Sequence, residues 1–488
     1  MKVLHTCLSG ILLALFYASC LQAQQVYTLE QVIALARQQS VKALQAKNRK
    51  ETGYWAYRVY LAEQRPQLSL SGTLPDYNRS ILTNRNDDGS IGFIPVSNLN
   101  TDIGLRISQK IGWTGGEVFL NSSLARLENL SGNFAGVQYS SVPLRIGFEQ
   151  PLFGFNALKW DKKIEPLKYE ESTKKFHEDL ESIASESTDL FFNLLIARAN
   201  LEIALTNKAK HDTLFQIAQQ RFELGTLSEN DLLQLNLQVI NASQDANQAK
   251  LDIELSQLKL KSFLGMNTNF EDIILEIPYS LPDFSVNPLL AIEKAKEHRQ
   301  AFISFQRQKL EAQRDLAEAQ KNSKLNLNIF GSFGFTQSAD RFLDTYLNPQ
   351  NQQVLQIGFQ IPVIDWGKQK AGVKTATANQ ELVLNQVEIE KTTFEQEIFL
   401  YVKQLELFRE KVIFSKQLDE IAQKRYAIAY QRFLISKISV TDLNIALSEK
   451  DTAKQSYLNA LYKFWQSYFL IRKLTLFDFE KNIPITHP

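Results

Sequence analysis

Two copies of one structural unit lie within this chain. Arg221-Phe222 and Arg432-Phe433 are 211 positions apart. The same offset relates further short motifs, namely Asp231-Leu232 with Asp442-Leu443, and Leu144-Arg-Ile-Gly-Phe148 with Leu355-Gln-Ile-Gly-Phe359. A unit of about 200 residues is much longer than a solenoid repeat of ~20–50 residues. The duplication therefore predicts two structurally equivalent halves that build one pseudo-symmetric body.

The first 23 residues have the pattern of an export signal. Lys2 is followed by an apolar stretch, Ile11 to Phe16, and by a small-residue cleavage site that ends at Ala23. Both cysteines, Cys7 and Cys20, fall in this segment, so a chain cut after Ala23 has no thiol for a disulfide or a metal. Cys20 also follows Tyr-Ala-Ser, which resembles a lipoprotein cleavage box. The alternative is therefore a lipidated N-terminus at Cys20.

Charge and hydropathy limit the function classes that remain. Lys and Arg number 54 and Asp and Glu 53, so no basic excess points to nucleic acid. After the signal, no stretch reaches the ~18 apolar residues of a membrane helix. If the mature chain crosses a membrane, it must do so with strands.

The sequence predicts no enzyme. His177, His211, His298 and His487 are not spaced as metal ligands, and we expect them on solvated faces or in the tail. There is neither a phosphate-binding glycine loop nor a nucleophile elbow. We therefore predict no catalytic, cofactor-binding or metal-binding residue.

Long helices dominate both halves. The stretches from Asn156 to Phe222 and from Trp366 to Phe433 are each about 67 residues, or about 100 Å of helix, which requires a coiled-coil partner. The chain after each turn supplies that partner, because apolar or small residues recur on a heptad. In the first half these are Leu232, Leu235, Val239, Ala242, Ala246, Ala249, Ile253, Ser256, Leu260 and Phe263. In the second half they are Leu443, Ala446, Lys450, Ala453, Tyr457, Ala460, Phe464, Ser467, Ile471 and Leu474. We predict helical hairpins over 156–264 and 366–475.

Period-two alternation predicts strands in both halves. In 324–362, Leu355, Ile357 and Phe359 alternate with polar residues. In the first half the strands occupy 66–151 and contain a long loop, 73–143, which is either an added barrel hairpin or an external flap. Strands with one apolar and one polar face suit a transmembrane barrel, but they also suit a half-buried soluble sheet. Periodicity alone leaves both open.

Each half opens with a helix. Thr28 is placed to cap a helix that runs to about Gln64, and Asn287-Pro288 opens the equivalent helix. The domain organisation that we predict is a signal peptide at 1–23, a first repeat at 24–286, a second repeat at 287–477 and a C-terminal tail at 478–488.

In these features the mature chain resembles the TolC-like outer-membrane efflux family. The most specific matching segments are Tyr27–Ala36, Gln150–Phe153 with Ile361–Gly367, and the turn Arg221–Leu232. The resemblance implies a mainly α fold with a β-barrel portion, located in the outer membrane with most of the chain in the periplasm. Long antiparallel coiled-coil helices would form an α-barrel tube continuous with a transmembrane β-barrel shared by a homotrimer.

The implied function is the exit duct of a tripartite efflux system that passes small molecules such as drugs. Its partners would be a periplasmic adaptor, an inner-membrane transporter and outer-membrane lipid. A type I secretion channel for polypeptides is the alternative within transport. A non-conducting coiled-coil or adhesive protein of the envelope is the alternative from another class.

The resemblance places the functional residues at the hairpin turns, which form the periplasmic tip in this family. The predicted adaptor contacts are Arg221, Leu224, Gly225, Thr226, Ile435, Ser436 and Lys437, where Ser436 replaces the glycine of the first turn. The predicted tip constriction is formed by Asp231, Asp442, Phe433 and Ile438, with Phe433 and Ile438 as apolar contacts in place of polar locks. Ser228-x-x-Asp231 and Ser439-x-x-Asp442 are also capping-box patterns, so these carboxylates have a purely structural alternative.

Overall fold

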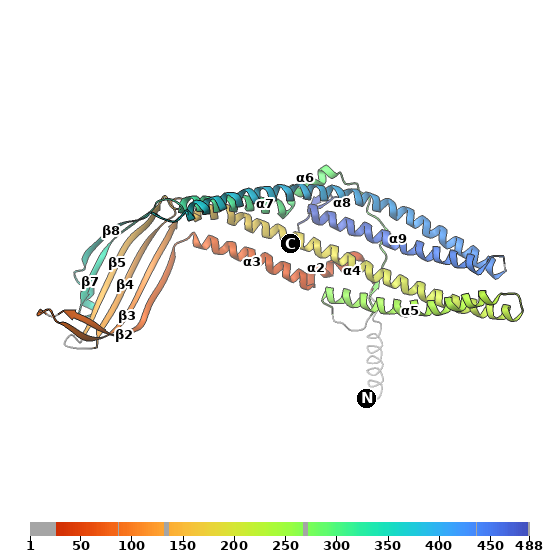
Figure 1. Ribbon diagram of the computed structural model, residues 1–488, viewed down its shortest axis with the longest axis horizontal. Coiled ribbons are helices and arrows are strands. Elements are labelled where there is room, and N and C mark those ends of the chain that lie inside the picture. Colours follow the sequence, from red (N-terminus) through yellow and green to blue (C-terminus); the bar gives the residue numbers. More distant parts are fainter. Residues whose placement is uncertain (1–25, 86, 131–135, 267–271, 436, 487–488) are drawn as a thin grey trace, which may run out of the picture. The chain divides into compact units, whose positions relative to one another are not determined.

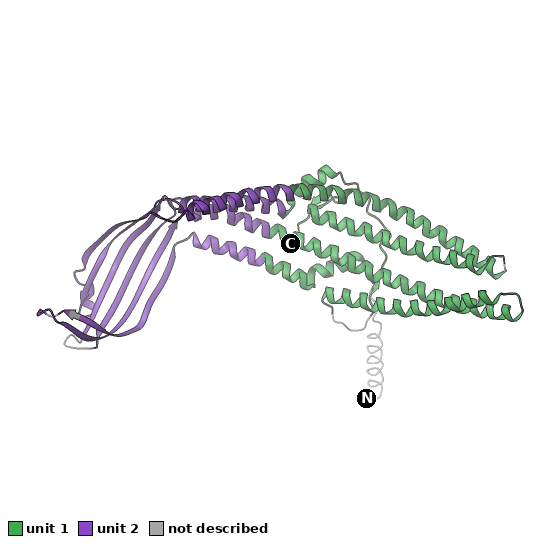
Figure 2. Ribbon diagram, in the orientation of Figure 1, with its two compact units in different colours: residues 1–50, 173–300, 391–488 green, residues 51–172, 301–390 purple. Residues whose placement is uncertain are grey.

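The computed structural model describes residues 26–85, 87–130, 136–266, 272–435 and 437–486. Long helices and one large antiparallel sheet make up these residues (Figure 1). They divide into two compact units (Figure 2). One unit, from residues 1–50, 173–300 and 391–488, is helical, and the other, from 51–172 and 301–390, contains the sheet. The predicted signal segment, including Cys20, and Ser436 in the second turn lie outside the described residues.

Two helical hairpins carry the duplication. Helix α4 (Ala157–Glu223) is followed by α5 (Glu229–Leu264), and α8 (Lys368–Leu434) by α9 (Val440–Thr475). The first helix of each hairpin has 67 residues and the second has 36. Every position of the two predicted heptad seams is buried or partly buried, as packing against the longer helix requires. Among the described residues, no helix is long and apolar enough to cross a membrane.

The helix that opens each half is interrupted, which the sequence did not predict. The first half has α2 (Leu29–Gln39) and α3 (Val41–Glu63), and the second has α6 (Pro288–His298) and α7 (Gln300–Asn322). Ser40 and Arg299 separate them, both with extended backbone angles. Thr28 forms a full capping box on α2, and the Asn287 side chain caps α6. A two-residue strand, β1 (Val26–Tyr27), pairs in parallel with β6 (Ile274–Leu275).

Six antiparallel strands form one sheet, in the order β2-β3-β4-β5-β7-β8. Their bounds are β2 Gln67–Arg85, β3 Ile91–Ile111, β4 Gly116–Asn129, β5 Gly136–Leu152, β7 Asn326–Ala339 and β8 Gln350–Gln360. A short 3-10 turn, η2 (Leu343–Tyr346), lies between β7 and β8. Of the two interpretations of 73–143, the external flap is wrong, because most of this segment is strand and belongs to the sheet. Its polar stretches and two prolines, Pro75 and Pro95, hide the alternation that marks the other strands.

The two faces of the sheet differ in chemistry. One face, called the apolar face below, carries exposed Leu68, Leu70, Ile103, Leu105, Ile107, Leu144, Ile146, Phe148, Phe333, Phe335, Leu355, Ile357 and Phe359. The register keeps these residues together, since Leu70 is opposite Leu105 and Ile146 is opposite Phe333. On the other face Arg106 pairs with Glu117 at 2.8 Å, and Arg145 donates to Gln352 at 2.6 Å. An exposed apolar face with a polar reverse is the pattern of strands between lipid and water.

The C-terminal segment folds back onto the helical unit. Strands β9 (Phe477–Asp478) and β10 (Ile483–Pro484) form a small antiparallel pair. Leu476, Phe477 and Asp478 are buried. The described part of the predicted tail is thus ordered against the end of α9.

Candidate functional site

The turn between α4 and α5 is a helix end closed by glycine. Gly225 has a φ of +69°, and its N–H donates to the carbonyl of Phe222 at 2.9 Å. The Thr226 N–H donates to the carbonyl of Arg221 at 2.8 Å. These two bonds form a Schellman motif, which satisfies the last carbonyls of α4. Leu224 is left pointing outward, with 78% of its surface exposed.

The turn between α8 and α9 repeats this ending. The Lys437 N–H donates to the Arg432 carbonyl at 2.9 Å, which matches the bond from Thr226 to Arg221 in the first turn. Ile435 occupies the position of Leu224 and is also exposed. Each turn therefore presents one exposed aliphatic side chain at its end.

Arg221 joins the two turns. Its Nη2 donates to the carbonyl of Leu434 at 3.0 Å, and its guanidinium lies over the Phe433 ring at 5.6 Å. The carbonyls at a helix C-terminus carry partial negative charge, so the end of α8 favours a cation. Sequence comparison within the repeat could not reveal this contact, because Arg432, the equivalent residue, has no matching bond to the first turn among those described.

Both predicted acidic residues act as helix caps. The Ser228 hydroxyl accepts from the Asp231 N–H at 3.2 Å and donates to its carboxylate at 2.7 Å. Asp442 completes a full capping box with Ser439, because its carboxylate also accepts from the Ser439 N–H at 3.1 Å. The Ser439 hydroxyl and backbone bonds hold the pKa of Asp442 below its usual value. The capping alternative is thus present in the structure, while a ring of carboxylates at a tip stays a prediction.

An apolar cluster joins the two hairpins just behind the turns. Phe433 is buried in it, and Ile438 packs against it. Its buried members come from both hairpins: Leu214, Ala218, Leu235, Tyr426, Phe433, Val440, Leu443, Ala446 and Leu447. Phe433 and Ile438 therefore contribute to packing within one subunit. Their predicted role in a constriction is not tested by this geometry.

A buried polar layer lies beyond the apolar cluster, and sequence reasoning missed it. His211, expected on a solvated face, is instead only 4% exposed, and its Nδ1 has no hydrogen-bond partner among the described residues. Nearby, Asn207 donates to Asp451 at 2.6 Å, and Lys450 pairs with Asp451 at 2.8 Å. Burial lowers the pKa of His211. The sequence alone does not indicate whether a single histidine in a 67-residue helix is buried or exposed, because the helix buries different faces along its length.

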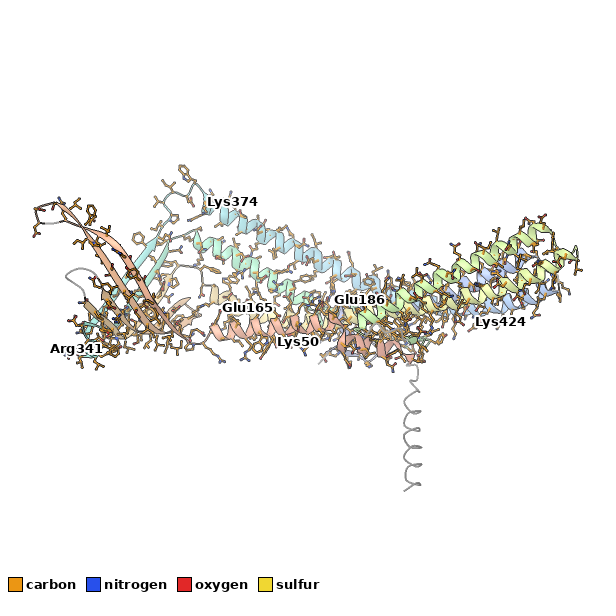
Figure 3. The ribbon with its side chains drawn as sticks, turned by 90° about the horizontal axis from the view of Figure 1, so that it is seen from below. Lys50, Glu165, Glu186, Arg341, Lys374 and Lys424 are labelled. Carbon is orange, nitrogen blue, oxygen red and sulfur yellow. The ribbon has the colours of Figure 1, made fainter. Side chains whose placement is uncertain are left out.

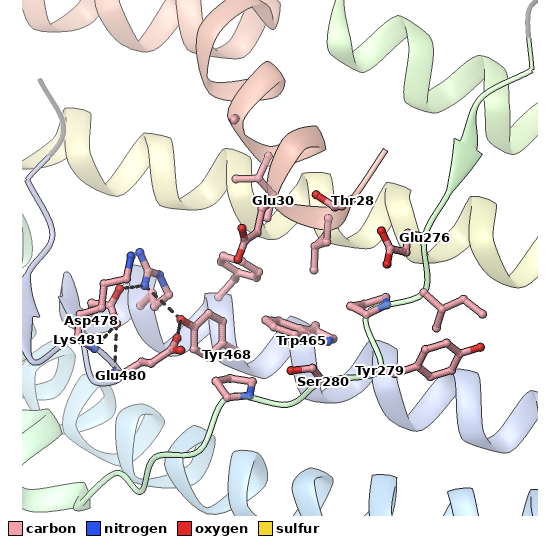
Figure 4. A pocket seen from close by; sticks show the side chains of 18 of the residues that line it. Thr28, Glu30, Glu276, Tyr279, Ser280, Trp465, Tyr468, Asp478, Glu480 and Lys481 are labelled. Carbon is pink, nitrogen blue, oxygen red and sulfur yellow. Dashed lines mark hydrogen bonds and ion pairs between the residues drawn. The ribbon is translucent and has the colours of Figure 1, made fainter. Parts of the chain in front are cut away.

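A buried ion cluster holds the base of the helical unit together. Glu181 of α4 is fully buried and accepts from Arg37 of α2 at 2.6 Å and from Arg472 of α9 at 3.2 Å. Arg472 also pairs with Asp478 of the C-terminal segment. A cavity of about 680 Å³ lies beside this cluster, lined in part by Glu30, Tyr279, Trp465 and Tyr468 (Figure 4). Among the described residues, no group of His, Cys, Asp and Glu is arranged to hold a metal ion.

Comparison with known proteins identifies this architecture. Residues 117–266 match the family model described as "Outer membrane efflux protein". The fold matches the Campylobacter jejuni CmeC outer membrane channel at 16% identity and a TM-score of 0.67, covering 94% of this chain and 87% of that one. It also matches the Neisseria gonorrhoeae MtrE outer membrane channel in its open state, at 12% identity and 0.62, covering 92% and 88%. The Vibrio cholerae outer membrane protein VceC matches at 12% identity and 0.60, covering 94% and 97%. None of the curated proteins matches the sequence.

Residues 117–266 are thus similar in sequence to the outer-membrane efflux protein family. The solved structures establish the TolC-like fold, and the family model supplies the link in sequence. The chain therefore has the channel fold that these outer membrane proteins share.

Proposed function

We propose that the protein is a homotrimeric exit duct of a tripartite efflux system and passes small molecules such as drugs. The observation that carries the proposal is a pair of exposed apolar seams on α5 and α8. Leu400, Leu407, Phe414, Ile421 and Ile428 recur every seven residues on α8, and each is more than half exposed. Ile435 continues the series into the turn. A heptad of exposed apolar side chains is a coiled-coil surface without its partner.

The second seam lies on α5. Leu233, Leu237, Ile240, Leu251 and Leu258 follow heptad spacing and are about half exposed. The opposite side of α5 carries the buried residues that pack against α4. Helix α5 therefore has one side covered by α4 and one exposed side, called its open side below. The open side of α5 and the open side of α8 both carry exposed apolar side chains at heptad spacing. Pairing α8 of one copy with α5 of the next covers both and generates a closed ring.

The sheet supports the same assembly. Its edges are β2 and β8, and six strands are too few to enclose a water-filled barrel in lipid. Unpaired edges in a bilayer leave backbone groups unsatisfied at several kcal/mol each. Three such sheets supply about 18 strands, which is within the range of closed outer-membrane barrels.

In such a duct the two turns lie at the entrance and supply the contact with a periplasmic adaptor. Leu224 and Ile435 are exposed at the ends of the hairpins, and Gly225, Thr226 and Lys437 shape the backbone beside them. Small exposed aliphatic groups at repeated positions suit a partner that contacts both hairpins in an equivalent way. Export of small molecules and export of polypeptides share this architecture, and the similarity of residues 117–266 to efflux proteins supports the small-molecule assignment.

The test begins with the native mass of the protein extracted from separated outer membranes in mild detergent. We expect a trimer. Ile421→Lys should dissociate it, because the charge enters the open α8 seam, whereas Glu420→Lys places the same side chain at the adjacent exposed polar position and should leave the trimer intact. A monomer in the wild type, or equal effects of the two variants, would refute the ring.

The cargo is tested by deleting the gene. Raised sensitivity to dyes and antibiotics, restored by the wild type and by Glu420→Lys but not by Ile421→Lys, is the expected outcome. Loss of a secreted polypeptide with unchanged drug sensitivity would favour the secretion channel. No change in either would favour a non-conducting envelope protein.

A further inference from the structure

A cavity of about 680 Å³ lies within the helical unit, beside the buried ion cluster (Figure 4). Its lining comes from three segments that are distant in the chain, namely the start of α2, residues 276–282 after β6, and α9 with the C-terminal residues that follow it (Figure 3). Strands β1 and β6 run in parallel and both end at the cavity, because the lining begins with the residue after each strand, Thr28 and Glu276. Binding sites for drug-sized molecules have volumes of ~300–1,000 Å³. The cavity is therefore large enough for one such molecule.

The lining segment after β6 is held in place at both ends. At its start, the Glu276 N–H donates to the Tyr27 carbonyl at 3.0 Å. At its end, the Arg409 side chain of α8 donates to the Pro282 carbonyl at 3.0 Å. The cavity is thus formed by the fold itself, and a site that needs no rearrangement loses less entropy on binding.

Aromatic side chains of α9 form one side of the cavity. Trp465 and Tyr468 meet edge-on with ring centroids 5.4 Å apart, and Phe469 lies beside both. Arg472 lies over the Tyr468 and Phe469 rings, at 5.5 and 6.0 Å. Among the described residues, no cation lies over Trp465, and its buried indole N–H has no hydrogen-bond acceptor. Because tryptophan is the ring that attracts cations most strongly, Trp465 offers an unused surface for one.

Negative charge exceeds positive charge at the cavity. Five carboxylates line it or pair with its lining: Glu30, Glu181, Glu276, Asp478 and Glu480. Three cations are in the lining: Arg37, Arg472 and Lys481. Glu181 and Asp478 neutralise the two arginines. Glu30 and Glu276 are exposed and have no ion pair among the described residues, and in Figure 4 they lie across the cavity from Trp465. A cation is therefore the favoured occupant.

We propose that the cavity binds a lipophilic organic cation, with its rings against Trp465 and its positive charge towards Glu30 and Glu276. The aromatic side supplies apolar contact and attraction for the cation, and the carboxylates reject an anion of the same shape. A bare metal ion would make no use of the aromatic side, and the described residues hold no group arranged for one. Every lining residue belongs to one unit of one chain, so binding does not require the proposed trimeric duct.

Two dyes of opposite charge test the preference. Rhodamine 123 and fluorescein methyl ester share one ring system and an ester group, and they carry a positive and a negative charge respectively at about pH 8. Fluorescence anisotropy measures the binding of each dye to the detergent-purified protein. We expect saturable binding of rhodamine 123, and binding of fluorescein methyl ester that is at least about tenfold weaker. Equal affinities would mean apolar partition alone and would overturn the proposal.

Substitutions identify the carboxylates that hold the charge. The double variant Glu30→Gln with Glu276→Gln should weaken the binding of rhodamine 123 at least about fivefold, without weakening that of fluorescein methyl ester. Glu293→Gln with Glu420→Gln is the matched control, because it neutralises two exposed carboxylates of the same unit outside the lining. It should change neither affinity by more than about twofold. All four side chains are exposed, so both variants should fold. Equal effects of the two double variants would contradict the assignment.

Thiol protection locates the bound dye. Both native cysteines lie in the predicted signal segment, so an introduced cysteine can be labelled selectively. Ser280 lines the cavity, whereas Ser448 is exposed on α9 outside it. Bound rhodamine 123 should slow the reaction of Ser280→Cys with a maleimide severalfold and leave that of Ser448→Cys unchanged. Saturable binding without protection of Ser280→Cys would place the dye elsewhere and overturn the site.

Discussion

Glu181 offers the sharpest test of what holds the helical unit together. Its carboxylate is fully buried and is shared by Arg37 at 2.6 Å and Arg472 at 3.2 Å. The two arginine side chains are 23% and 14% exposed, so both are mostly withdrawn from water. Glu181→Gln removes the carboxylate that pairs with Arg37 and leaves Arg472 with Asp478. Breaking a buried ion pair from one side costs about 3–5 kcal/mol, because the remaining charge stays buried without compensation.

Glu186 on the same helix provides the matched control. It pairs with Lys42 at 2.6 Å, but the two side chains are 55% and 40% exposed. Exposed pairs contribute about 0–1 kcal/mol. Glu186→Gln should therefore have at most a small effect, although it removes an ion pair of equal length, in this case between α4 and the start of α3.

Hydrogen exchange of α2 measures the difference locally, without requiring reversible unfolding of a membrane protein. Because every 1.4 kcal/mol is a factor of ten, Glu181→Gln should speed exchange of Leu29–Gln39 by about 10²- to 10⁴-fold. Glu186→Gln should change it by less than about tenfold. Equal effects of the two variants would refute the argument that burial, and not the ion pair as such, sets the stabilisation.

Three further predictions follow from other positions. Phe433→Ala should destabilise the hairpins by about 3–5 kcal/mol, whereas Phe222→Ala, its exposed repeat partner, should cost far less when both are measured by thermal unfolding. Gly225→Ala should cost about 1–2 kcal/mol, because its φ is +69°; Gly372→Ala, inside α8 with open space around it, should instead stabilise by up to about 1 kcal/mol. Since burial lowers the pKa of His211, the folded state favours neutral imidazole, so stability is full above pH ~6.5 and falls as the pH drops below it. The melting temperature should therefore fall more between pH 7.5 and 5.5 in the wild type than in His211→Gln, and equal falls would contradict this.

The sequence predicts the helical hairpins well because their signals are local and repeated. A heptad seam is visible wherever side chains three and four residues apart are buried together, and a capping serine is read from its own position and the residue three later. Ser228 and Ser439 accordingly cap the helices that the pattern assigned to them.

Signals that depend on distant contacts are lost in the sequence. The partners of Glu181 are 144 and 291 positions away, so its burial cannot be deduced from its neighbours. His211 was misplaced for the same reason. The choice between added strands and an external flap for 73–143 stayed open, because polar stretches and the prolines Pro75 and Pro95 interrupt the alternation used to recognise strands.

The size of the residues on the two seams, more than their period, indicates which hairpin is interior. Equivalent heptad positions hold Ala246 and Ile253 in α5 but Tyr457 and Phe464 in α9. Helix α9 packs against α8 through the Lys454–Asp419 pair, against α4 through Tyr462 and Asp189, and against α6. Helix α5 buries alanines together with Leu235, Leu260 and Leu264, and it leaves further leucines and Ile240 exposed on its open side. The two duplicated hairpins therefore differ according to their position. The inner helix, α9, packs with aromatic residues, whereas the outer helix, α5, has an exposed aliphatic surface that suits a neighbouring copy.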